Sequence, residues 1–320
     1  MTDPQKIIAL SGGVGGAKLS LGFDKTTSPI DLAIVANTGD DFEHLGLHVS
    51  PDIDTLIYTL AGVNNEESGW GRANETWSFM SALRDLGGET WFQLGDKDLA
   101  LNVLRTQQLK SGNSLSVVTE AVATCFGIGA SILPMTDDPV RTMIHTNSGL
   151  LAFQEYFVRE QCRPAVTDIS FNGIETAKPS PKFAELLSNA SVSAFVICPS
   201  NPYLSIEPIL RLPSVRDSLK SHPAPVIVVS PVIAGQSVKG PTSKIMREFG
   251  LACSSIEIAR HYLDIADVIV IDHKDANSAS EIEALGIRVC MSGIMMNSVE
   301  DKIRLANDVL GLIFECSRFD

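Results

Sequence analysis

Apolar residues recur along the chain in short, nearly continuous runs, which are separated by stretches with helical periodicity. The runs are rich in valine and isoleucine and cover residues 7–11, 32–37, 193–198, 225–230, 268–272 and 287–290. Strands that are buried on both faces show this pattern, because neither face presents polar side chains to water. The pattern therefore predicts an α/β fold in which helices cover both faces of a mostly parallel sheet.

The middle of the chain has a different pattern. Helical spacing covers residues 54–60, 74–86, 96–110 and 114–126, and short alternating runs follow at 131–134, 141–146 and 150–157. Asn147-Ser148-Gly149, before the last run, is typical of a hairpin turn. We therefore predict one domain over residues 1–320, with a mainly helical insertion at about 54–126 and a small antiparallel region at about 131–170.

Composition and charge exclude several classes of partner. Hydrophobic residues make up 44% of the 320 residues, as in a chain with a sizeable core. The formal net charge of −13 argues against nucleic acid or an anionic membrane as a partner, because both attract basic surfaces. The apolar runs are shorter than the roughly 18 residues of a membrane span. With no recognisable signal peptide and no Cys-x-x-Cys pair among its six cysteines, the chain is expected to be cytoplasmic.

A glycine-rich stretch between the first strand run and a helical pattern is the main functional signal. It reads Ser11-Gly12-Gly13-Val14-Gly15-Gly16-Ala17-Lys18. Backbone amides at such a turn, together with the helix dipole, attract anions. We predict that its four glycines and Lys18 bind a phosphate group. The spacing matches neither a Walker A loop nor the dinucleotide fingerprint, and a structural turn without a ligand is the alternative.

Acidic residues follow the second strand run. Asp40 lies in Thr38-Gly39-Asp40-Asp41 and is expected beside the glycine turn, since ligands lie beyond the carboxyl ends of parallel strands. Carboxylates repel phosphates unless a cation separates them, so we predict Mg²⁺ at Asp40. A solvated Asx-type turn is the alternative. Asp54 is predicted as a ligand or general base, although helix capping explains either Asp52 or Asp54.

Two segments of the helical insertion supply further candidates. Trp70 lies between two glycines, which makes a core position difficult, and it is a candidate for stacking on a planar ligand. Trp77 is expected to pack in the core. Lys97 lies at a charged helix entry between two aspartates. It is a candidate contact for an anion or a polar ligand edge, and helix capping by its neighbours is the alternative.

Two later loops follow strand runs. Ser200 and Asn201 come directly after the third run, where they are candidates for binding a nucleotide. The Asn201 amide offers a donor and an acceptor that suit a base or ribose edge. Lys239 and Lys244 follow the next run and would place cations near phosphates. Prolines flank both loops, so plain turn chemistry is the alternative for each.

Taken in order, these motifs resemble the 2-phospho-L-lactate transferase family of deazaflavin cofactor biosynthesis, over about residues 7–260. Besides the glycine and acidic turns, the resemblance is carried by Gly69-Trp70-Gly71, Leu94-Gly95-Asp96-Lys97-Asp98, Pro199-Ser200-Asn201-Pro202 and Val238-Lys239-Gly240-Pro241. The resemblance implies a Rossmann-like fold, a requirement for Mg²⁺ and a homodimer.

The resemblance also implies a reaction and roles for residues. The ribityl hydroxyl of an 8-hydroxy-5-deazaflavin (FO) attacks the phosphorus that carries a lactyl, enolpyruvyl or related three-carbon acid. This acid is joined to GMP by a diphosphate, GMP leaves, and the product is the precursor of coenzyme F-420. By this resemblance, the four glycines cradle the donor diphosphate, Asp40 and Asp54 hold Mg²⁺, and Asn201 contacts guanine or ribose. Asp54 would also orient the attacking hydroxyl, and Asp54 and Lys97 would contact the deazaflavin.

Two features leave alternatives open. Family members often carry arginine at the position of Lys97, and lysine keeps the charge but loses bidentate contact. A non-enzymatic regulator that binds UDP-sugars with the same architecture is the second candidate function. The segments at residues 50–55 and 94–98 favour the transferase, because a nucleotide-sugar sensor has no use for an acceptor site. An NAD dehydrogenase is disfavoured by the failed fingerprint.

Overall fold

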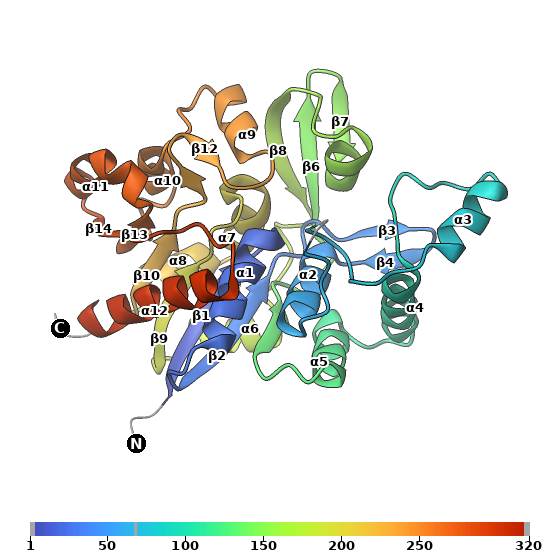
Figure 1. The fold of residues 1–320 in the computed structure, drawn as a ribbon, viewed down its shortest axis with the longest axis horizontal. Helices are drawn as coiled ribbons and strands as arrows, with labels where there is room; N and C mark the ends of the chain where they lie inside the picture. Colours follow the sequence, from blue (N-terminus) through green and yellow to red (C-terminus); the bar gives the residue numbers. More distant parts are fainter. Residues whose placement is uncertain (1–3, 67–68, 317–320) are drawn as a thin grey trace.

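A seven-stranded parallel sheet forms the centre of the molecule (Figure 1). The structure is a computed structural model that describes residues 4–66 and 69–316. The strand order is β14-β13-β10-β9-β1-β2-β5, and each neighbouring pair is parallel. The strands are β1 (Gln5–Ser11), β2 (Ile30–Ala36), β5 (Ser131–Pro134), β9 (Val192–Ile197), β10 (Val226–Val229), β13 (Val268–Ile271) and β14 (Arg288–Met291). The predicted α/β fold and its strand runs are confirmed.

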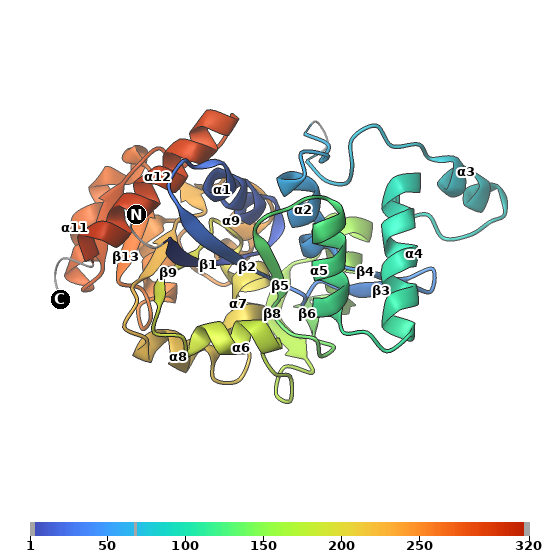
Figure 2. The same ribbon diagram turned by 90° about the horizontal axis from the view of Figure 1, so that it is seen from below.

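Alternate residues of each strand pack into two different cores, which explains the continuous apolar runs. Ile7 and Ala9 of β1 face one core, and Ile8 and Leu10 face the other. The first core includes residues of α1 (Gly13–Lys25), α2 (Pro51–Leu60), α5 (Leu115–Cys125) and α12 (Val299–Cys316). The second includes residues of α6 (Pro181–Leu187), α7 (Glu207–Leu210), α8 (Val215–Ser221), α9 (Thr242–Glu248), α10 (Ser255–His261) and α11 (Ala279–Ala284). Figure 2 shows α1 and α12 on one side of β1 and α6 and α8 on the other.

The strand β5 corrects one prediction. Residues 131–134 were expected in the antiparallel region, but β5 pairs in parallel with β2, with Ala33 opposite Ser131 and Ala36 opposite Pro134. A four-residue apolar run does not distinguish a parallel edge strand from an antiparallel one. The connection from β2 to β5 passes through several helices, and such a crossover is what a parallel pair requires.

The antiparallel region itself is confirmed as a separate three-stranded sheet, in the order β7-β6-β8. Its strands are β6 (Arg141–Thr146), β7 (Gly149–Ala152) and β8 (Val166–Asn172). The predicted hairpin joins β6 to β7, with Thr146 opposite Gly149. The run predicted at 150–157 is extended only to Ala152, and the π-helix η1 (Glu155–Arg159) follows it.

The predicted helical segments between β2 and β5 are also present. They form α2, α3 (Ser78–Asp85), α4 (Asp96–Lys110) and α5, together with an unpredicted hairpin of β3 (Phe42–His44) and β4 (Leu47–Val49). Figures 1 and 2 show α3 and α4 at the end of the molecule opposite α11. The remaining elements are η2 (Pro202–Ile206), β11 (Val232–Ile233), β12 (Gln236–Ser237) and η3 (His273–Ser278).

Candidate active site

A cleft of about 530 Å³ is lined by the loops that follow four adjacent strands of the sheet. Gly13 follows β1, Asp40 follows β2, Ser200 follows β9 and Pro231 follows β10. These strands are parallel, so their carboxyl ends lie at one edge of the sheet, which is where ligands bind in open α/β folds. The cleft therefore lies where the sequence predicted that the glycine and acidic turns would meet.

The glycine turn connects β1 to α1 as predicted. Gly12 is the N-cap of α1, and Gly13 has a φ of 62°, a left-handed conformation that favours glycine. The Gly12 amide donates to Ser200 Oγ at 3.2 Å, and the Gly13 amide donates to Asp52 Oδ1 at 2.7 Å. Val14 and Gly15 follow in the first helical turn, where amides have no acceptor within the helix, and both line the cleft. This turn therefore presents an anion-binding helix N-terminus to the cleft.

Close packing leaves no room for a side chain at three of the glycines, since a Cβ added to Gly12 would lie 2.5 Å from Ser205 Cβ. A Cβ added to Gly15 would lie 2.2 Å from the Pro199 carbonyl oxygen, and one added to Gly16 would lie 2.2 Å from Ser11 Oγ. Gly15 lines the cleft, whereas Gly16 is buried and is not among the cleft-lining residues. The structural role of these glycines is thus clear, and their contact with phosphate stays a prediction.

Two buried carboxylates lie beside the glycine turn. Asp40 lines the cleft, and its Oδ1 has no hydrogen-bond partner among the residues that the structure describes. Burial and the nearby Asp52 raise the pKa of Asp40 well above its ordinary value. Asp52 also lines the cleft and accepts hydrogen bonds from the Gly13 amide and from Asn37 Nδ2, the latter at 3.0 Å. Burial raises the pKa of Asp52 to about 6, although both hydrogen bonds oppose the rise.

Asp40 and Asp52 are suitable ligands for a divalent cation. Their ionised forms are disfavoured by burial and by a neighbouring carboxylate, which is Asp52 for Asp40 and Asp41 for Asp52, and a bound cation would relieve both effects. Within the described residues, no group of three or more histidine, cysteine, aspartate or glutamate side chains could hold a metal ion. Mg²⁺ commonly takes only one or two carboxylates and completes its shell with water and phosphate oxygens, so the pair fits this ion.

Asp54 lies away from the cleft. Both of its carboxylate oxygens accept hydrogen bonds from the Arg105 guanidinium, and it is not a cleft-lining residue. Positions two apart on a helix point to nearly opposite sides, so Asp52 faces the glycine turn while Asp54 faces α4. The sequence motif favours Asp54 over Asp52 as the ligand, but the helical spacing of the two residues means that only one of them can face the glycine turn. The expected capping role is wrong, because no side-chain hydrogen bond caps α2.

The loop after β9 contributes two of the predicted residues. Ser200 is buried and lines the cleft, where its hydroxyl accepts the hydrogen bond from Gly12. The Asn201 Oδ1 atom caps η2 by accepting from two backbone amides. Its Nδ2 atom is buried and has no partner within the described parts of the chain. Asn201 therefore serves as a structural cap and keeps an amide donor at the cleft.

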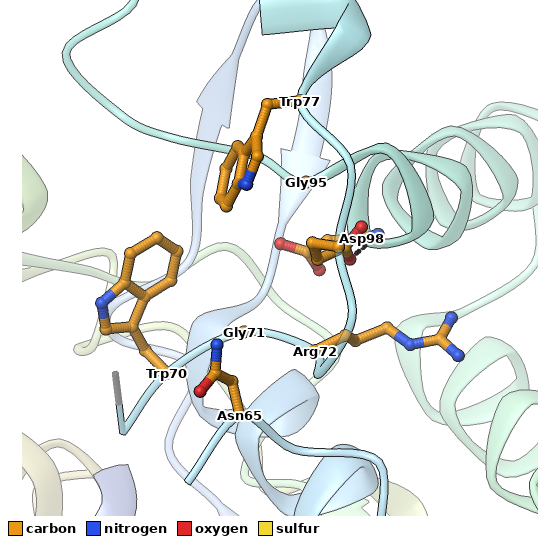
Figure 3. A pocket seen from close by; sticks show the side chains of 8 residues that line it. Asn65, Trp70, Gly71, Arg72, Trp77, Gly95 and Asp98 are labelled. Atoms are coloured by element: carbon orange, nitrogen blue, oxygen red, sulfur yellow. Dashed lines mark hydrogen bonds between the residues drawn. The ribbon is translucent and has the colours of Figure 1, made fainter. Parts of the chain in front are cut away.

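A pocket of about 50 Å³ adjoins the cleft at Trp70, which lines both (Figure 3). Trp70 is 52% exposed and Trp77 is 42% exposed, with ring centroids 6.3 Å apart. The expectation that Trp77 packs in the core is therefore wrong. The exposed rings flank the pocket, so Trp70 stays a candidate for stacking on a planar ligand.

Lys97 and Lys18 differ in their access to the cleft. Lys97 lines neither the cleft nor the pocket, and its ammonium donates to the Asn74 carbonyl oxygen at 2.6 Å. Lys18 lines the cleft, and its ammonium donates to the Met296 carbonyl oxygen at 2.8 Å. Of these two lysines, Lys18 is the one that the cleft presents to an anion.

The sheet and cleft define a Rossmann-like α/β protein with a cleft at the carboxyl ends of its strands. The family model of the 2-phospho-L-lactate transferase CofD matches residues 7–287. The chain belongs to this transferase family, which confirms the resemblance seen in the motifs.

Individual proteins agree with this assignment. A phosphoenolpyruvate transferase from Kitasatospora aureofaciens is 38% identical over 96% of this chain and 97% of its own length. A 2-phospho-L-lactate transferase from Methanocaldococcus jannaschii is 37% identical over 95% of this chain and 97% of its own. A UPF0052 family member from Bacillus halodurans shares the fold with a TM-score of 0.65 over 97% of this chain and 100% of its own, at 13% identity. No helix in the described residues is long and apolar enough to cross a membrane.

Proposed function

We propose that this chain transfers a phospholactyl-type group from a guanylyl diphosphate donor to the ribityl hydroxyl of FO and releases GMP, a step in coenzyme F-420 biosynthesis. The transferred group is 2-phospho-L-lactate, phosphoenolpyruvate or a related three-carbon acid phosphate. Family membership supports the transferase class, and curated relatives include both phosphoenolpyruvate and 2-phospho-L-lactate transferases.

The donor diphosphate would bind at the N-terminus of α1. The amides of Val14 and Gly15 and the ammonium of Lys18 are available there, and the Asn201 amide would contact the nucleoside. Asp40 and Asp52 would hold Mg²⁺, which supplies neutralisation of charge on the phosphate oxygens. Transfer of a phosphoryl group from a diphosphate to a hydroxyl requires little covalent help from a protein, so positioning and electrostatics carry most of the rate acceleration.

The acceptor would approach from the side of Trp70. This exposed ring lies where the cleft meets the smaller pocket, and a deazaflavin is planar and suited to stacking. Contacts of FO with Asp54 and Lys97 stay predictions, because in this structure both side chains are bonded to other parts of the protein.

The observation that carries the proposal is the shared cleft of the α1 N-terminus and the Asp40–Asp52 pair. An anion site and a cation site in one cleft suit a metal-bound diphosphate. The regulator that binds UDP-sugars would also use a glycine turn, but the family match favours the transferase. The homodimer and the cytoplasmic location stay predictions.

The test is to incubate the purified protein with FO, Mg²⁺ and each candidate guanylyl donor, and to measure GMP release and the phosphorylated deazaflavin. Asp40→Asn should lower turnover at least about a hundredfold if Asp40 helps to neutralise the transferring phosphate. Asp31→Asn, at the opposite end of β2 and exposed, is the matched control and should behave as the wild type. Tight UDP-sugar binding without FO binding or GMP release would contradict the proposal.

A further inference from the structure

Lys239 lines the cleft but belongs to neither the glycine turn nor the acidic turn, and the proposed function gives it no role. It lies in the loop between β12 and α9 and is exposed. Among the described residues that line the cleft, the lysine and arginine side chains are those of Lys18 and Lys239 alone. In a chain with a net charge of −13, two ammonium groups in one cleft indicate a site for anionic groups.

Lys239 contacts the segment that carries Trp70. A Cβ added to Gly69 would lie 2.7 Å from Lys239 Nζ, so the ammonium rests against the backbone of Gly69. The loop of Lys239 and the segment of Gly69 and Trp70 are distant in sequence, yet both line the cleft. Lys239 is therefore placed near the proposed acceptor side, whereas Lys18 belongs to the helix that follows the glycine turn.

The two ammonium groups also differ in their partners. Lys18 donates to Met296, and burial and the charge of Lys239 lower the pKa of Lys18. Lys239 is exposed, and its ammonium lies against the backbone of Gly69. An anion bound between Lys239 and Lys18 would relieve their mutual repulsion.

The donor carries two kinds of anionic group, a diphosphate and a carboxylate, and Lys239 is a candidate to bind the one that the other cleft residues do not bind. Under the proposed function, the diphosphate would be bound by the α1 amides and by a cation that Asp40 and Asp52 would hold. The three-carbon acid adds a carboxylate, and the acid is esterified to the phosphorus that the acceptor hydroxyl attacks, so it must lie close to the acceptor side of the diphosphate site. We propose that Lys239 binds the carboxylate of the transferred three-carbon acid. This inference rests on the proposed function and adds a residue that recognises the acid.

Calorimetric titration with two probes tests the assignment. The lactyl guanylyl diphosphate donor and GDP share the diphosphate, and only the donor has the carboxylate. Both are titrated, with Mg²⁺ present, into the wild type, Lys239→Gln, Lys239→Arg and the control Lys110→Gln, an exposed lysine that does not line the cleft. Loss of a hydrogen bond between charged groups should weaken donor binding about tenfold in Lys239→Gln. GDP binding should not change, and Lys239→Arg should keep most of the donor affinity.

The outcomes separate this inference from the proposed function. Unchanged donor affinity in Lys239→Gln would overturn the inference, and so would an equal loss for GDP, which would assign Lys239 to the phosphates. If the wild type bound neither probe, the proposed function would fail and the inference with it. Lys239 is exposed, so its variants should keep the wild-type melting temperature, which is measured in parallel.

Discussion

The guanidinium of Arg105 and the carboxylate of Asp54 form an ion pair that is buried on both sides. Their side chains are 2% and 8% exposed, and Arg105 donates to both carboxylate oxygens. Arg105 also donates to Asn102 Oδ1 at 2.8 Å. The pair joins α4 to α2, the helix whose first turn brings Asp52 to the glycine turn. It therefore links α4 to the helix that positions Asp52, and each buried charge is neutralised by the other.

We predict that Arg105→Met destabilises the protein by about 3–5 kcal/mol, because Asp54 would remain buried without its cation. Burial already raises the pKa of Asp54, and Arg105 opposes that rise. Urea unfolding measures the change. In the double variant with Asp54→Asn, the loss should be clearly smaller than the sum of the two single losses. A cost below about 1 kcal/mol for the single variant would contradict this account, since surface ion pairs have that value.

A second prediction separates the two aspartates of α2. Asp52→Asn should raise the Mg²⁺ concentration that gives half-maximal GMP release at least about tenfold, because Asp52 lines the cleft beside Asp40. Asp54→Asn should mainly lower the free energy of unfolding, because its partner Arg105 lies outside the cleft. Mg²⁺ titrations of turnover and of melting temperature distinguish these effects. The opposite pattern would place the metal at Asp54, as the sequence motif suggested.

Two glycine substitutions should differ in a way that only packing explains. Gly13→Ala meets no atom closer than 4.0 Å, so its cost is the strain of a positive φ, about 1–2 kcal/mol. Gly15→Ala would place Cβ 2.2 Å from the Pro199 carbonyl oxygen and must displace the loop of Ser200 and Asn201. We expect it to cost more than Gly13→Ala and also to weaken donor binding. Thermal unfolding and titration with GDP measure both effects, and a larger loss for Gly13→Ala would contradict this prediction.

The buried carboxylate of Glu207 predicts a response to acid. Burial alone would raise its pKa, but His261, whose Nε2 lies 3.3 Å from Glu207 Oε2, and the hydrogen bond from Arg211 prevail and lower the pKa of Glu207 to about 2. A lowered carboxylate pKa stabilises the folded state above the unfolded pKa near 4.5, and the stabilisation is lost as pH falls toward the folded value. The wild type should therefore lose about 3 kcal/mol more than Glu207→Gln between pH 5 and about pH 2. Denaturant unfolding as a function of pH measures this, and parallel curves for the two proteins would refute it.

The sequence by itself determined the fold class, the turn that opens the site and the family. Continuous apolar runs of this length are typical of strands that are covered on both faces, and the two cores show why. Gly12 and Gly13 lie where β1 ends and α1 begins, and the change from an apolar run to glycines and then to helical spacing predicts this turn from neighbouring residues alone. The order of motifs identified the family, because family resemblance depends on residues in sequence and not on their contacts.

Tertiary structure alone decided which side chains meet. The edge position of β5 depends on pairing with β2, a contact that its short run does not encode. The partner of Asp54 is Arg105, which lies fifty-one residues later on another helix. The approach of Lys239 to Gly69 likewise joins loops that are far apart in the chain. Local pattern determines elements through backbone and solvent preferences, whereas these contacts depend on how the elements pack, and packing is decided by the whole chain.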